Sequence, residues 1–170
     1  MPILITPEDG SGILDANSYV SIEDARKYAV NHGYVLSNED DVVAVQLIRA
    51  FDYIEAKECE FQGERLYIES AFPRRGVRIN GVDLPSNRIP SFLIAAQVQL
   101  VIAQHNGIDI MPNFVAADYV TKEKVGPLET TYADPLSVGI APKLGAVDAM
   151  LAPLFGRCAS GGIGMRTVRV

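Results

Sequence analysis

Four arginines lie close together in the middle of the chain, within residues 71–90. A guanidinium group binds carboxylates and phosphates through paired N–H donors, so such a cluster has several possible uses. It can pair with acids of a neighbouring subunit, contact nucleic-acid phosphates, or remain solvated in a surface loop. The sequence leaves these three uses open for the four residues, which are Arg74, Arg75, Arg78 and Arg88.

Residues that carry catalysis or bind metals are few and scattered. The histidines, His32 and His105, fall at predicted helix ends, where a partly positive side chain is favourable. Neither Cys59 nor Cys158 has metal-ligand spacing, and the sequence leaves their disulfide state open. The glycine-rich tail follows no strand, so it does not form a phosphate-binding loop. We therefore expect no enzyme activity, no catalytic residue, no metal and no cofactor.

The net charge of −6 is unevenly distributed along the chain. Residues 1–69 carry 14 acids and 5 bases, whereas residues 70–170 carry 7 acids and 10 bases. An acidic chain argues against a dedicated duplex-DNA binder, which normally carries a surplus of Lys and Arg. Opposite-signed halves suit subunits that attract one another head to tail in a ring, but ordinary solvated faces explain the pattern equally well.

The length of 170 residues and the hydrophobic content of 48% predict one folded domain with a modest core. The N-terminus has no basic residue before its short apolar run, which is not typical of a signal peptide. The longest apolar stretch, residues 89–103, contains two glutamines and is too short to span a bilayer. We expect a protein made in the cytoplasm, with no membrane contact.

Apolar residues at helical spacing predict the main elements. Ser21 and Asp24 form a capping-box pattern before a short helix that Gly33 ends, and Ser37 with Asp40 opens a longer one. A helix that is apolar almost all round is the expected centre of the core, with Pro90 at its first position. The predicted helices lie within residues 21–33, 37–58, 91–106 and 142–155.

The remaining segments predict strands and arms. Asn80–Gly81 is typical of a tight β-hairpin, and alternating residues at about 117–133 indicate a ribbon bent at Gly126–Pro127. The fold class is therefore mainly α, a small bundle of about four helices with a hairpin or ribbon and extended arms. We expect an extended N-terminal arm at 1–17, a helical domain at 18–156 and a flexible tail at 157–170, which could add a strand to a partner's sheet.

Several pieces in order resemble a family of tailed-bacteriophage head-tail adaptor, or connector, proteins. The pieces, which span about Asn17 to Phe155, are ANSYVSIEDARKYAVNHG, LIRAFDYIE, FQGER, FPRRGVRINGVDLPSNRIPSFLIAAQ, KVGPLETTYAD and LAPLF. The family usually has Trp-Pro-Arg where this chain has Phe72-Pro73-Arg74, a change that keeps an aromatic residue. Some members of this group are described as single-stranded-DNA-binding proteins, named after a primosomal protein.

The resemblance implies a structural virion protein in the neck between head and tail, assembled in the bacterial host cytoplasm. It would form a ring of about twelve copies beneath the portal, although the sequence does not fix that number. Its partners would be its own copies, the portal and downstream neck or tail proteins. Genome DNA would pass through the ring without sequence recognition during packaging and ejection, and the ring would provide the docking site for the tail.

This interpretation predicts a set of residues at subunit or portal contacts. They are Arg74, Arg75, Arg78, Arg88, Tyr119, Lys122, Lys124, Arg166 and Arg169. The alternative is a replication accessory protein that binds single-stranded DNA, for which salt-sensitive affinity for an oligonucleotide is expected. A small regulatory or toxin-like host protein is a third possibility, for which the sequence offers no positive feature.

Overall fold

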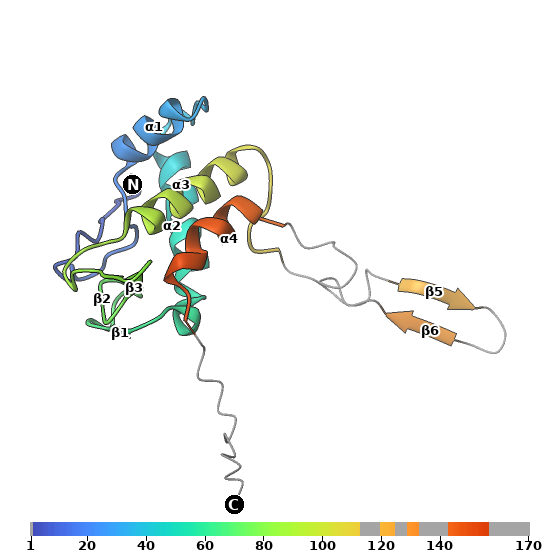
Figure 1. Ribbon diagram of the computed structural model, residues 1–170. Helices are drawn as coiled ribbons and strands as arrows, with labels where there is room; N and C mark the ends of the chain where they lie inside the picture. Colours follow the sequence, from blue (N-terminus) through green and yellow to red (C-terminus); the bar gives the residue numbers. More distant parts are fainter. Residues whose placement is uncertain (1, 113–119, 125–128, 133–142, 157–170) are drawn as a thin grey trace, which may run out of the picture.

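The computed structural model of the chain describes residues 2–112, 120–124, 129–132 and 143–156 (Figure 1). Within these ranges, helices predominate over three small antiparallel sheets, which supports a mainly helical fold but not a regular bundle. No helix in this described part is long and apolar enough to cross a membrane. The helices are α1 (Ile22–Asn31), α2 (Asp40–Glu55), α3 (Ser91–His105) and α4 (Gly145–Leu151), with 3-10 turns η1 (Glu58–Glu60) and η3 (Ala152–Leu154).

Helix α3 is the centre of the core and contacts α1, α2 and α4 (Figure 1). Seven of its 15 residues are buried, six of them apolar, because other helices cover it on several sides, which confirms the prediction that this segment is the centre of the core. The helix ends before Gly107, whose positive φ of 83° a residue with a side chain rarely adopts. The buried apolar residues of α3 are Leu93, Ala96, Val98, Leu100, Val101 and Ile102.

The two predicted helix caps differ in outcome. Ser21 caps α1 as expected, because its hydroxyl accepts the N–H of Asp24 at 3.1 Å. The prediction for Ser37 is wrong: its hydroxyl accepts the N–H of Glu39, and α2 begins only at Asp40. Arg26 explains the difference, since it donates to the Ser37 carbonyl and pairs with Asp40 at 2.6 Å, which fixes the connection between the helices.

Other helix ends also differ from the predicted ones by a few residues. Helix α2 ends at Glu55 rather than near residue 58, and Pro90 is the N-cap of α3 rather than its first helical residue. Helix α4 begins at Gly145, a few residues later than predicted. These shifts leave the existence and order of the helices unchanged.

The short strands form three hairpin-like pairs. The pair β3 (Arg78–Ile79) and β4 (Val82–Asp83) joins through Asn80 and Gly81, both with positive φ, as predicted. The pair β5 (Val120–Lys124) and β6 (Glu129–Tyr132) is antiparallel, as expected for the ribbon. The pair β1 (Glu64–Arg65) and β2 (Arg74–Arg75) was not predicted, although it shapes the arginine-rich loop.

The N-terminal segment, for which we expected an extended arm, folds back as a loop against α3. The Glu8 N–H donates to the Ser18 carbonyl at 2.8 Å, which closes the loop on itself. The fully buried Gln97 amide then holds it: its oxygen accepts the Tyr19 N–H at 2.9 Å, and its nitrogen donates to the Ser18 hydroxyl and the Leu47 carbonyl. The predicted tail at 157–170 and Cys158 lie outside the described residues.

Candidate functional site

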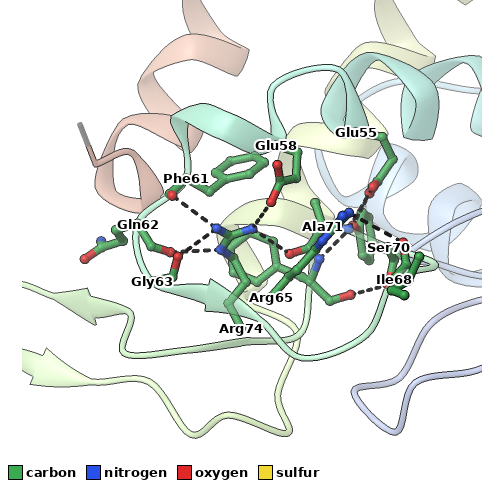
Figure 2. A network of polar contacts seen from close by, with 12 residues as sticks. Glu55, Glu58, Phe61, Gln62, Gly63, Arg65, Ile68, Ser70, Ala71 and Arg74 are labelled. Carbon is green, nitrogen blue, oxygen red and sulfur yellow. Dashed lines mark hydrogen bonds and ion pairs between the residues drawn. The ribbon is translucent and has the colours of Figure 1, made fainter. Parts of the chain in front are cut away.

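The guanidinium group of Arg74 is enclosed by the loop that joins α2 to α3 (Figure 2). Only 4% of this residue is exposed, and each of its N–H donors has an acceptor. Five N–H donors are the full complement of an arginine side chain, so none is left for another partner. The acceptors are the main-chain carbonyls of Gln62 (2.9 Å), Ala71 (3.2 Å), Phe61 (3.3 Å) and Gly63 (2.8 Å) and the carboxylate of Glu58 (3.0 Å).

These contacts make Arg74 an internal support for the loop rather than a contact residue. Its charge is balanced by Glu58, and its guanidinium carbon lies 5.9 Å from the centroid of the Phe72 ring. It thereby connects the end of η1 with strand β2, across the β1–β2 pair (Figure 2). Our expectation that Arg74 faces a partner does not fit this buried position, whereas the next residue, Arg75, is exposed.

A second polar cluster holds the other end of the same loop. The Tyr19 hydroxyl donates to one oxygen of Glu55, and the Ala71 N–H donates to the other at 2.7 Å. The Phe72 N–H in turn donates to the Tyr19 hydroxyl at 3.2 Å. Burial raises the pKa of the Glu55 carboxyl, and burial beside that carboxylate raises the pKa of Tyr19 well above its usual value. The loop is therefore fixed from both sides, by the buried Arg74 and Tyr19 and the half-buried Glu55.

The raised pKa of Glu55 predicts a pH dependence of stability. At pH values between the pKa of Glu55 in the unfolded chain and its raised pKa in the folded chain, this carboxyl binds more protons in the folded chain. The stability that Glu55 contributes is therefore fully present below its pKa in the unfolded chain. It is lost as pH rises through the folded pKa. We expect Glu55→Gln to remove this decline when denaturation midpoints are measured from about pH 4 to about pH 7. Identical pH profiles for Glu55→Gln and the unaltered chain would contradict the assignment.

The outer side of the loop carries exposed cations and one exposed aromatic ring. Arg65, Arg75 and Arg88 are exposed, as is Arg78, and 38% of Tyr67 is exposed. Arg78 is engaged locally, because it pairs with Asp83 at 2.8 Å and donates to the Gly81 carbonyl. Arg75 lies opposite Glu64 in the β1–β2 register. The surface therefore carries both signs of charge. Arg65, Arg75 and Arg88 are the candidate anion contacts, although Arg65 also donates to the Ile68 carbonyl at 3.5 Å.

Among the described residues, no contact joins the other residues predicted at subunit or portal interfaces to the loop between α2 and α3. Lys122 and Lys124 belong to β5, where their Cα positions lie opposite Thr131 and Glu129 of β6. Tyr119, Arg166 and Arg169 lie outside the described residues. Their assignment to contacts stays a prediction, as do those of Arg75, Arg78 and Arg88.

Comparison with known families matches the chain to a family model. The model of the family described as "Putative DnaT-like ssDNA binding protein" matches residues 2–170. The chain belongs to this DnaT-like family. Comparison with curated proteins and with solved structures gives no match.

Membership of the DnaT-like family corrects the identity that the sequence pieces suggested. The match covers nearly the whole chain and points to a family described by single-stranded DNA, so the expected head-tail adaptor is wrong. The expectations that depended on it, a ring beneath a portal and a place in the virion neck, lose their support with it. The description of some members as single-stranded-DNA-binding proteins was the more informative part of the resemblance.

Two residues of the DnaT-like chain for which no role was expected from the sequence, Tyr67 and Glu8, lie near these arginines. Tyr67 follows β1 in a segment that we interpreted only as a turn and a short extended piece. Glu8 is buried, with 2% exposed, in the N-terminal loop. A signal for Glu8 was available: it is followed by Gly10 and Gly12, and glycine-rich backbone can wrap its amides around a carboxylate.

Proposed function

We propose that the chain binds single-stranded DNA and acts as a non-enzymatic accessory protein. The observation that carries the proposal is the family match over residues 2–170. The loop geometry supports it, because half-buried contacts of Arg74 and Glu55 hold a backbone whose outer side carries exposed arginines and Tyr67. DNA is thus the proposed partner, met in the cytoplasm where we expect the chain to be made.

The mixed charge of the loop favours single strands over duplex. A duplex binder relies on many cations along a dense phosphate backbone, which a chain of net charge −6 does not offer. A single strand also presents unstacked bases, and these bind to aromatic side chains with little dependence on sequence. The few exposed arginines would then position the strand, while base contacts supply much of the affinity.

The salt dependence of binding tests this proposal quantitatively. Three phosphate contacts, from Arg65, Arg75 and Arg88, predict a slope of log affinity against log salt of about −2 for a single strand. Affinity should therefore fall by about 20-fold between about 50 mM and about 200 mM salt. Fluorescence anisotropy with a labelled oligonucleotide of about 20 nucleotides measures it. A slope near zero, or no binding at low salt, would refute the proposal.

Removal of two arginines tests whether the loop supplies the phosphate contacts that set this salt dependence. In Arg75→Gln with Arg88→Gln, the slope should shrink to about −0.7, because about one phosphate contact remains. Arg49→Gln serves as the control, since Arg49 is exposed on α2 outside the loop and pairs with Asp109 at 2.6 Å. Its slope should match that of the unaltered chain. Equal slopes for all three proteins would exclude the loop as the phosphate contact.

A further inference from the structure

We propose that Tyr67 is a base-stacking surface, with one ring face seated on Gly12 and the other presented to a single-stranded base. This inference rests on the proposed function and names the contact that would recognise the unpaired base. Base–aromatic stacking supplies affinity without sequence readout, which suits a chain whose exposed charges are mixed. It would also make affinity depend on the presence of bases, whereas phosphate contacts alone would not.

The position of Gly12 against Tyr67 carries the inference. A Cβ added to Gly12 would lie 2.6–2.7 Å from Cε2, Cζ and Cδ1 of the Tyr67 ring. Because Cε2 and Cδ1 stand on opposite sides of the ring, nearly equal distances place that point over the ring face rather than at its edge. The glycine backbone therefore covers one face, and only a residue without a side chain leaves room for the ring. The other face is the one that a base could reach, and 38% of Tyr67 is exposed.

The loop beneath Tyr67 is held in place by the buried Glu8 carboxylate. One oxygen accepts the N–H groups of Gly10 at 2.8 Å and Gly12 at 2.9 Å, and the other accepts the Ile13 N–H at 2.7 Å. Glu8 is 2% exposed, so these bonds are protected from water. A fixed ring loses little conformational freedom on binding, which favours a preorganised stacking contact.

The same loop places Tyr67 among the exposed arginines. A Cβ on Gly10 would lie 2.1 Å from the Asn87 carbonyl oxygen and 3.2 Å from the Arg88 nitrogen, so Gly10 packs on the backbone beside Arg88. Arg65 precedes Tyr67 by two residues, and its side chain reaches toward the Ile68 carbonyl (Figure 2). The turn from Gly10 to Gly12 thus lies between Arg88, which Gly10 contacts, and Tyr67, which Gly12 contacts. A strand with a base on Tyr67 would have cations on both sides for its phosphates.

The test compares three variants with a labelled oligothymidine. Tyr67→Ala should weaken binding by about 5-fold or more, the lower end of the effect of losing one stacked base, without changing the salt slope. Tyr67→Phe should keep the affinity, because phenylalanine retains the stacking face. Tyr34→Ala is the matched control, since Tyr34 is similarly exposed but lines a separate cavity beside α3 and α4, and it should leave affinity unchanged.

Tyrosine fluorescence gives a readout that does not depend on the stability of the alanine variant. The chain has no tryptophan and seven tyrosines, so stacking on Tyr67 should quench part of the emission. Tyr67→Phe should bind with the same affinity but without that part of the quenching. Unchanged quenching in Tyr67→Phe, or unchanged affinity in Tyr67→Ala, would overturn the stacking role and leave DNA binding intact. Absence of binding by the unaltered chain would instead overturn the proposed function itself.

Discussion

Arg74→Ala should lower the free energy of unfolding by about 4 kcal/mol, a large part of the stability of a domain of this size. The substitution removes five hydrogen bonds and leaves the Glu58 carboxylate and four main-chain carbonyls without their donor. Lysine should rescue only part of the loss, because its three donors spread from one point and cannot match a planar fork. Urea unfolding followed by far-UV circular dichroism measures the effect.

The neighbouring arginine supplies the control. Arg75 is exposed, so Arg75→Ala should change the free energy of unfolding by no more than about 0.5 kcal/mol. The two residues are adjacent in β2 and identical in chemistry, so a difference between them reports burial and bonding alone. Similar effects at Arg74 and Arg75 would show that the buried network contributes little.

Glu8→Ala should lower the free energy of unfolding by about 2–3 kcal/mol. The N–H groups of Gly10, Gly12 and Ile13 would lose a charged acceptor that water can replace only if the loop opens. Amide hydrogen exchange should therefore accelerate at these three positions, together with the fall in denaturation midpoint.

Asp9 is the natural comparison for Glu8, because it is the next residue and is exposed. Asp9→Ala removes only local bonds with Ser11, among them the one from the Ser11 N–H at 2.9 Å, and should leave the midpoint unchanged. Unchanged exchange at Gly10, Gly12 and Ile13 in Glu8→Ala would show that the carboxylate does not hold the loop. The support proposed for Tyr67 would then also be lost.

Local sequence patterns predicted the elements that local physics controls. The all-apolar pattern of residues 91–106 identified α3 because such a helix must be buried on most sides, and Asn80–Gly81 identified its hairpin because both residues tolerate positive φ. The Ser37 cap failed because a tertiary contact from Arg26 decides where α2 begins. A capping pattern says nothing of such a contact.

The contacts that hold the candidate site, those of Arg74 and of the β1–β2 pair, could not be predicted from the sequence because they are also tertiary. Nothing local distinguishes Arg74 from Arg75, and four of the five acceptors of Arg74 are main-chain carbonyls, which every residue has. The β1–β2 pair joins two-residue strands across a loop, so it leaves no periodic pattern. Function was harder still, since the net charge argued against a dedicated duplex-DNA binder and the ordered motifs pointed to a different family.

A competition between single-stranded and duplex DNA of the same sequence tests whether the chain prefers single strands. The chain is first bound to a labelled single strand at low salt, and unlabelled single strand or duplex is then added while anisotropy is followed. We expect the single strand to displace the label at concentrations at least about 10-fold lower than the duplex does, because only the single strand has unpaired bases that can stack. Equal displacement by both, or no complex to displace, would contradict this expectation.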